Sequence, residues 1–294
     1  MPELFNRLAV LTVKTKTGRL IDFKDLRISF QIGKDSTSTP NNAKISLYNL
    51  SKASRTLFEE EGLTLILKAG YAGLSKDPNQ AVTKVIFIGD AASSKTVRKG
   101  PDIVTQIEAG DGEKKLVERY INTSFSGASK ENPNGTRIKT MLITLIKALG
   151  YVPNKDKEKR LLDELSILGN RSTIHGMTMS GPAKHFIDAL IEKEGLEWSI
   201  QDDEIEISDP KASSQGTAVV LNPQTGLLDV SKEEKNRISF VSLMNPDINP
   251  TSFIKITSDF AGLNEAVYKV RKVSYEGDTR EGRWHLMGEA ESHD

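Results

Sequence analysis

The stretch that decides the fold is Leu26-Arg27-Ile28-Ser29-Phe30-Gln31-Ile32, in which apolar and polar residues alternate strictly. A period of two places the apolar side chains on one face of a β-strand and the polar ones on the other. The alternation returns at residues 44–47 and again at 63–67. Residues 33–42 are polar and too many for a tight turn, so we expect a projecting hairpin tip there.

Residues 51–62 predict one short helix after these opening strands. Ser51 can cap its amino end and Gly62 can end it. Leu57 and Phe58 supply its buried face. The first hundred or so residues are therefore expected to be strands with a single helical interruption.

The middle of the chain changes to a helical period. The apolar residues that recur at intervals of three and four are Ile138, Met141, Leu142, Leu145, Ile146 and Leu149, and Gly150 can stop this helix. The pattern returns at residues 183–191 after Ser180-Gly181-Pro182, with Gly195 beyond its end, which is typical helix punctuation. Residues 156–168 predict a weaker helix.

The last third returns to strands. Residues 196–200 and 204–208 predict a hairpin around Gln201-Asp202-Asp203, and residues 212–216 form a linker of small side chains. The strand-like runs that follow are 218–221, 237–243, 252–257, 266–275 and 283–290. The order is β-rich, then α/β, then β-rich, which argues against a doubly wound parallel sheet.

One internal echo links the two β-rich segments. Residues 85–90, Val-Ile-Phe-Ile-Gly-Asp, lead through a polar tip to a strand with Glu108-Ala109. Residues 273–278, Val-Ser-Tyr-Glu-Gly-Asp, lead in the same way to Glu289-Ala290. An internal duplication explains the echo, and so does the ordinary turn chemistry of Gly-Asp, so the sequence leaves both readings open.

Composition excludes several classes of function. The chain has 294 residues, with 40 Lys and Arg against 40 Asp and Glu, and 37% hydrophobic residues. That length allows one large domain or two to three ordinary ones. A balanced charge argues against a general nucleic-acid binder, which needs a basic excess to neutralise phosphates. The absence of cysteine excludes thiol nucleophiles, cysteine-type zinc sites, iron–sulfur clusters and disulfides.

No stretch approaches the ~20 apolar residues of a membrane span. The amino-terminal residues 1–10 lack a basic region followed by an apolar one, so we expect no signal peptide. We expect the chain to fold in a cytoplasm and not to insert stably into a membrane.

The charged and histidine-containing candidates for a catalytic or metal site favour structural roles. Asp202, Asp203, Glu204, Glu206 and Asp209 lie close in sequence, but Glu204 and Glu206 alternate with isoleucines and so share the outer face of a strand. The four histidines, which lack metal-site spacing, are His175, His185, His285 and His293. We expect His185 on the polar side of its helix and His285 to be partly exposed.

The remaining candidates also have plain readings. Ser180 is a candidate nucleophile, and we expect it to be a helix cap. Gly135, in Asn132-Pro133-Asn134-Gly135, is part of a turn signature and not of a phosphate-binding loop. Residues 155–160 mix both signs of charge, which favours a solvated helix face over a nucleic-acid patch; the charged residues are Lys155, Asp156, Lys157, Glu158, Lys159 and Arg160. We therefore expect no catalytic residue, cofactor or metal. Long exposed strand edges favour an assembly component instead.

Several segments together resemble the baseplate hub proteins of contractile-tailed bacteriophages, which are related to the N-terminal part of VgrG spike proteins. The segments that carry the resemblance are 28–30 with 40–51, 85–90 with 108–113, 221–228, 241–250, and 268–279 ending in Trp284. The order and combination of these segments are more specific than any one of them.

The resemblance implies an α+β, mainly β fold with two tube-like antiparallel β-barrel domains, at 1–112 and 211–294, and an α/β insert at 113–210 between them. It implies a homotrimer whose six barrels form a pseudo-sixfold ring around a central channel in the virion tail. The implied partners are a tail tube or tube-initiator protein above, a spike protein below, baseplate wedge proteins and the tape-measure protein. DNA would only pass through the channel.

Two rival functions follow from related proteins. One is a hub that also degrades cell wall, which needs a further pair of carboxylates or a metal site. The other is a VgrG-like spike component of a secretion system, whose chain would continue into a long β-helical spike. The sequence offers no constellation for the first, and the second would require a separate spike protein.

Overall fold

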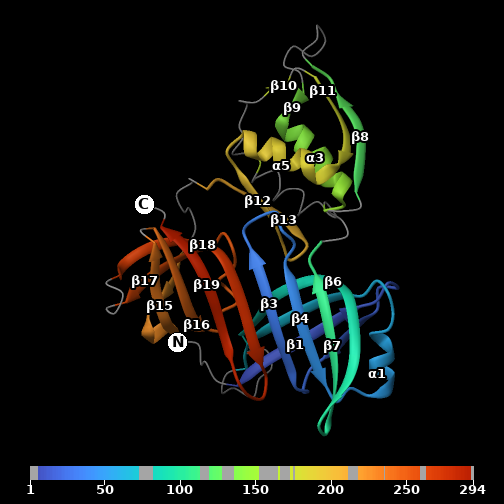
Figure 1. Ribbon diagram of the computed structural model, residues 1–294, viewed down its shortest axis with the longest axis vertical. Coiled ribbons are helices and arrows are strands. Elements are labelled where there is room, and N and C mark those ends of the chain that lie inside the picture. The colour runs from blue at the N-terminus through green and yellow to red at the C-terminus, as the bar shows by residue number, and fades with distance from the viewer. Residues whose placement is uncertain are drawn as a thin grey trace. The chain divides into compact units, whose positions relative to one another are not determined.

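The computed structural model is mainly β with a few helices, which confirms the predicted α+β class (Figure 1). It describes residues 6–72, 82–112, 119–127, 136–151, 165, 173–174, 176–210, 218–234, 236–258 and 263–292. The chain divides into two compact units. Unit 1 comprises Met1–Ser36, Pro40–Asp111 and Ser213–Asp294, and unit 2 comprises Thr37–Thr39 and Gly112–Ala212.

Unit 1 is built on one 13-stranded sheet in which every pairing but β14–β17 is antiparallel. The strands of the first segment are β1 (Arg7–Lys14), β2 (Leu20–Phe23), β3 (Ile28–Asp35), β4 (Asn42–Tyr48), β5 (Thr64–Tyr71), β6 (Val82–Lys99) and β7 (Asp102–Gly110). Those of the second are β14 (Val219–Leu221), β15 (Leu227–Glu234), β16 (Arg237–Leu243), β17 (Phe253–Ser258), β18 (Leu263–Asp278) and β19 (Trp284–Ser292). The strands predicted from alternation are confirmed within a few residues.

The two segments of this sheet share one strand order. The first runs β3-β4-β7-β6-β5-β1, and the second runs β15-β16-β19-β18-β17-β14. The chain visits the strands in the same sequence in both segments, with β3–β4, β6–β7, β15–β16 and β18–β19 as hairpins. They differ at one end, where β1 pairs with β5 antiparallel but β14 pairs with β17 parallel, and where β2 has no counterpart.

The pairing registers also coincide. Opposite Glu108-Ala109 of β7, strand β6 carries one extra residue, Ala92. Opposite Glu289-Ala290 of β19, strand β18 carries one extra residue, Arg271. A one-residue bulge at the same point of both hairpins marks equivalent positions. The Glu-Ala half of the sequence echo therefore corresponds to a structural equivalence.

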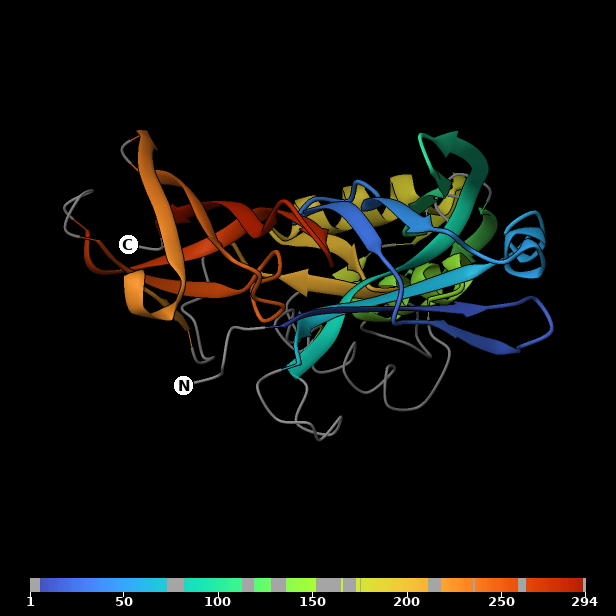
Figure 2. The ribbon, with the colours of Figure 1, turned by 90° about the horizontal axis from the view of Figure 1, so that it is seen from below.

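The Gly-Asp positions of the two repeated segments are not structurally equivalent. Gly277-Asp278 ends β18, and Asp278 Oδ1 accepts the backbone N–H groups of the following turn. Gly89-Asp90 instead lies inside β6, where the strand leaves β5 and joins β7, so the prediction of a turn there is wrong. A Cβ on Gly89 would come 2.6 Å from the Gly110 carbonyl oxygen, so glycine permits a close approach of two backbones at the bend. Figure 2 shows this bend in β6, drawn in teal.

One apolar core lies on one face of this sheet, and the two segments contribute to it together. Strands β3 and β18 join them through seven paired residues, from Asp35 opposite Lys272 to Ser29 opposite Asp278 (Figure 1). The buried Tyr275 hydroxyl donates to the Ile248 carbonyl oxygen at 2.6 Å, which fixes the loop between β16 and β17. The sheet is therefore continuous across the junction.

The helix after β4 is shorter than predicted. Helix α1 (Lys52–Leu57) is capped by Ser51, whose side chain accepts the Ser54 N–H at 3.1 Å, as predicted. It ends at Leu57, and Gly62 lies beyond it in the turn that leads to β5. Phe58, the residue that follows the last helical residue, is buried in the core. The helix therefore ends where its chain begins to pack into the core.

Unit 2 has two longer helices, α3 (Ile138–Leu149) and α5 (Ala183–Lys193), and three separate two-stranded sheets. The sheets pair β8 (Tyr120–Phe125) with β11 (Met177–Pro182), β9 (Thr136–Arg137) with β10 (Thr173–Ile174), and β12 (Glu197–Gln201) with β13 (Glu204–Ser208). All six predicted apolar positions of α3 are buried, and Gly150 ends it in the left-handed conformation, as predicted. The predicted helix at 156–168 lies outside the described residues apart from buried Leu165.

One prediction in unit 2 is wrong. Ser180 does not cap α5, because residues 180–182 continue β11 and pair with β8. The N-cap position is Pro182, and the first helical N–H, on Ala183, donates to the Arg119 carbonyl oxygen at 3.0 Å. Backbone pairing thus satisfies the helix start without a side chain. Among the described helices, none is long and apolar enough to cross a membrane.

Candidate assembly surface

The face of the unit 1 sheet opposite the core, here called the outer face, is polar across both segments. Side chains of neighbouring strands line up on it in rows, because cross-strand partners point to the same side. One row consists of His285, Glu276, Gln31, Lys44, Glu108 and Ser93. The next consists of Asp278, Ser29, Ser46, Gln106 and Lys95. All of these side chains are half-buried or exposed, and neither row breaks at the junction between β3 and β18.

Opposite charges balance one another along this surface. Lys44 Nζ lies 3.9 Å from the Glu108 carboxylate, with both side chains exposed. Such a pair contributes at most ~1 kcal/mol, so it matters for the local potential more than for stability. The outer face therefore presents no large field of one sign along these rows.

Two arginine–carboxylate clusters fix the hairpin of β18 and β19. Arg27 donates twice to Asp278 Oδ2, at 2.9 and 3.0 Å, and also pairs with Glu281. The hydrogen bond to Asp278 raises the pKa of Arg27 above its ordinary value, against partial burial, which lowers it. Arg27 also lies 4.4 Å from the centre of the Tyr48 ring. These contacts tie the first segment to the tip of the last hairpin.

The second cluster surrounds Glu291 on β19. Arg271 Nε donates to one carboxylate oxygen at 2.8 Å, and Arg237 Nη2 donates to the other at 3.2 Å. Burial alone would raise the pKa of Glu291, but the two guanidinium groups outweigh it, so the pKa lies below its ordinary value. Glu291 therefore links β16 and β18 as a carboxylate.

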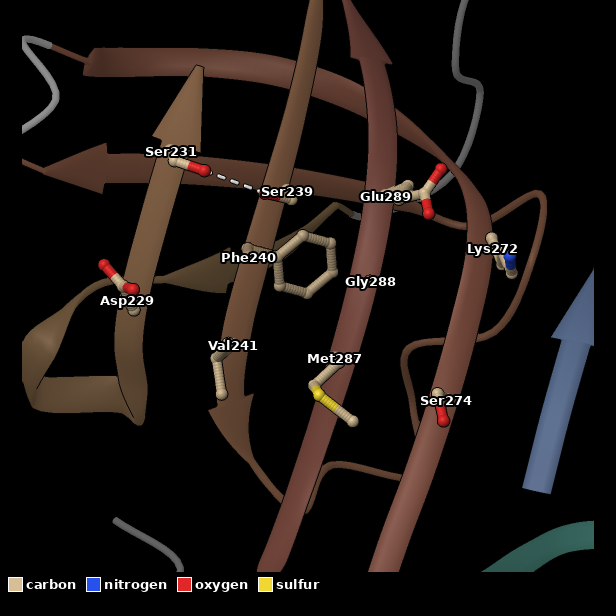
Figure 3. A pocket seen from close by; sticks show the side chains of 10 residues that line it. All are labelled: Asp229, Ser231, Ser239, Phe240, Val241, Lys272, Ser274, Met287, Gly288 and Glu289. Carbon is tan, nitrogen blue, oxygen red and sulfur yellow. Dashed lines mark hydrogen bonds between the residues drawn. The ribbon is translucent and has the colours of Figure 1, made fainter. Parts of the chain in front are cut away.

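Three shallow grooves follow one another across the outer face. The first, about 500 Å³, lies over β15, β16, β19 and β18, and Figure 3 shows its lining, with Ser231 and Ser239 sharing a hydrogen bond of 2.8 Å. The second, about 410 Å³, lies over β18, β3 and β4, and the third, about 360 Å³, over β4, β7 and β6. Serines and charged groups line them together with apolar side chains, which in the first groove are Phe240, Val241 and Met287.

Several strand edges of unit 1 have no strand partner among the described residues, and the longest of them belong to β15 and to the second half of β6, since β2 and β14 are short. Strand β15 pairs with β16 alone, and residues 91–99 of β6 pair with β7 alone. Except for half-buried Val230, residues 228–233 of β15 are exposed, as are most of residues 91–99 of β6. An unpaired strand edge is a ready site for pairing with another chain.

The predicted carboxylate cluster belongs to unit 2, whereas both edges belong to unit 1. Asp202 and Asp203 form the tight turn between β12 and β13, as predicted, with φ of 53° and 63°. Glu204 and Glu206 lie on the face of β13 opposite buried Ile205 and Ile207. No group of three or more potential metal-ligating side chains occurs in the described part of the chain.

The other candidate residues are dispersed. His185 is exposed on α5 and His285 is half-buried on β19, as predicted. Ser180 is exposed on β11. The remaining candidates lie outside the described residues: His175, His293, Gly135 and residues 155–160. The sequence reasoning expected polar strand faces and exposed strand edges but did not locate them, because their neighbours are brought together only by the sheet.

A mainly β chain with a duplicated strand order and a polar sheet face has the fold of phage tail proteins. The 43 kDa tail protein of prophage MuSo2 from Shewanella oneidensis has a similar structure, with a TM-score of 0.63, 9% identity and 98% of each chain covered. A tail protein from Neisseria meningitidis MC58 is similar with a TM-score of 0.60 and 8% identity, and the match covers 97% of this chain and 96% of that chain. A chain of the Francisella PdpA-VgrG complex is similar with a TM-score of 0.56 and 8% identity, and the match covers 98% of this chain and 58% of that chain.

The sequence carries the family assignment itself. The model of the baseplate hub gp41 family matches residues 8–290, so the chain belongs to the baseplate hub gp41 family. The resemblance drawn from the sequence is thus confirmed, and the chain is a structural component of a phage tail. A comparison with curated proteins finds no match.

Proposed function

We propose that this protein forms a trimeric hub ring in the baseplate, which adapts a sixfold tail tube to a threefold spike. The observation that supports this proposal most directly is the repeated strand order of the segments at 1–112 and 211–294. If each segment is one tube-like barrel domain, three chains present six similar units. A ring of six similar units matches a sixfold tube on one side, while its threefold repeat matches a trimeric spike on the other.

The outer face suits the wall of the channel in such a ring. Its polar rows continue without a break from β7 through β18. Paired charges such as Lys44 and Glu108 leave little net attraction for phosphates, whose binding depends on an excess of basic groups. DNA would pass along this face without being retained.

The remaining partners follow from this position. The ring would contact a tail tube or tube-initiator protein above and a spike protein below, with wedge proteins and the tape-measure protein as further neighbours. Unit 2 would lie at the periphery as the insert at 113–210. No catalytic role is proposed, and peptidoglycan clearing by the purified protein, abolished by one acidic substitution, would contradict that part of the proposal.

A reconstruction of the assembled tail tests the ring. We expect three copies of the chain per ring, each contributing two barrels; six copies, or two segments with unrelated folds, would contradict the proposal. Because the chain has no cysteine, Ser46→Cys introduces a unique thiol on the outer face. A maleimide too large for the channel should label it in the free protein but not in the assembled tail, while Lys52→Cys at the exposed start of α1 serves as the comparison.

A further inference from the structure

We propose that neighbouring chains of the ring join by β-strand addition, with the free edge of β15 in one chain pairing antiparallel to residues 93–99 of β6 in the next. The inference rests on the proposed trimer and names the contact that closes it. It comes from one juxtaposition on the sheet: β3 pairs with β18 inside the chain, while the equivalents of these two strands, β15 and β6, each have a free edge.

The equivalence is set by the shared strand order and the shared bulge. Strand β18 has β19 on one edge and β3 on the other after its bulge at Arg271. Strand β6 has β7 on one edge after its bulge at Ala92, and among the described residues nothing pairs with the other edge. Strand β15 corresponds to β3. Strand β3 pairs with β4, which pairs with β7, and in the same way β15 pairs with β16, which pairs with β19. The internal junction therefore defines the geometry of the external one.

The internal junction also fixes the register. Gln31 pairs with Glu276, and their equivalents, counted from the two bulges, are Ser231 and Val97. Two residues further along, Ser29 pairs with Asp278, which makes Asp229 of one chain the partner of Lys99 in the next. The register thus places opposite charges across the new junction.

Charge and exposure agree with this partner. Residues 93–99 of β6 carry Lys95, Arg98 and Lys99, all exposed. The free edge of β15 carries exposed Asp229, Lys232 and Glu233, so acidic side chains outnumber the basic one there. In the single chain, Asp229 Oδ1 accepts the N–H of neighbouring Val230 at 2.9 Å. Charged side chains on both edges, Asp229 on β15 and the basic residues on β6, discourage unspecific strand pairing. They leave each edge open to a strand of opposite charge.

Disulfide trapping in purified tails tests the register. The double variant Ser231→Cys, Val97→Cys should give intermolecular disulfides on oxidation, up to a covalent trimer and no larger species. Gln31→Cys with Glu276→Cys occupies the equivalent internal positions and should close within one chain at similar yield, which makes it the matched control. Ser231→Cys with Ser94→Cys, three positions out of register, should give little product.

The outcomes separate this inference from the proposed ring. A covalent trimer from the 97–231 pair supports the junction. If reconstruction finds three copies per ring and the 31–276 control closes, but the 97–231 pair does not, the junction is wrong and the ring stands. A ring with another copy number contradicts the proposed function itself, and the junction with it.

Discussion

The ring of Phe30 on β3 occupies the space where a side chain on Gly277 of β18 would lie, so a residue of the first segment packs against the bare backbone of the last. A Cβ on Gly277 would also come 2.8 Å from the Trp284 ring. Phe30 and Trp284 meet edge to face with their centroids 5.4 Å apart. The glycine is therefore what lets both rings close the core at the junction of the two segments.

Gly277→Ala should weaken unit 1 by about 1–3 kcal/mol, because overpacking forces buried rings out of their positions. Gly33→Ala, in the same ladder, is the control, since its nearest contact would be an ordinary 3.4 Å from Asn42. Chemical unfolding followed by Trp284 fluorescence, with Trp198 replaced by phenylalanine, measures both. Equal stability of the two variants would show that the Phe30 ring can move aside at no cost.

Leu145→Asp should unfold unit 2 while leaving unit 1 folded. Leu145 is fully buried in a core that is separate from the core of unit 1. A buried, unpaired carboxylate costs several kcal/mol. Trp198, in that core, and Trp284, in the other, report on each unit separately. Thr144→Asp, at the exposed neighbouring position, should leave both signals unchanged; native-like stability of Leu145→Asp would contradict the assigned face of α3.

Alternation predicts most of the strands of unit 1 that bury one face, although β1, which buries every second residue from Ala9 to Val13, is absent from the prediction. Strands β16, β17 and β19 alternate buried and half-buried side chains, so their apolar period is visible. Strand β15 buries Leu227 and is otherwise mostly exposed, so it has no apolar period to read. One of the two edges proposed to meet between chains therefore lies on a strand that sequence patterning does not detect.

The errors have a common cause in tertiary pairing. Gly89-Asp90 and Ser180-Gly181-Pro182 both have the local chemistry of a turn or a cap, yet each is held in a strand by its neighbours. The polar rows of the outer face likewise join residues such as Gln31 and Glu276, which are far apart in sequence. Local patterns cannot supply such cross-strand partners, whereas the family resemblance supplied the fold class.

Glu291→Gln should make the free energy of unfolding depend less on pH in the acidic range. The folded state lowers the pKa of Glu291 below its ordinary value of 4.5, so the carboxylate stabilises the fold at higher pH. That contribution is complete above the unfolded pKa and is lost as the pH falls through the folded pKa. The stability difference between wild type and variant, measured by unfolding across this range, should shrink with acid. Arg271→Gln, which removes the closest donor, should flatten the profile in the same way; a constant difference would contradict the assignment.

Exchanging the charges proposed to meet between chains should break and then restore assembly. Lys99→Asp would place a carboxylate opposite Asp229 of the next chain, and Asp229→Lys would place two ammonium groups together. Exposed pairs contribute ~0.2–1 kcal/mol each, so the three junctions of a ring should lose about 1–3 kcal/mol in either single variant.

The double variant Lys99→Asp, Asp229→Lys reinstates opposite charges and should recover incorporation into tails, counted as hub copies per tail at low ionic strength. Because salt screens exposed charges, the single-variant defects should shrink as ionic strength rises. Lys68→Asp, at the one exposed position of β5, a strand that pairs with β1 and β6 on its two sides, should assemble normally. If the double variant assembles no better than either single one, Lys99 and Asp229 do not meet, and the register of the junction must be different.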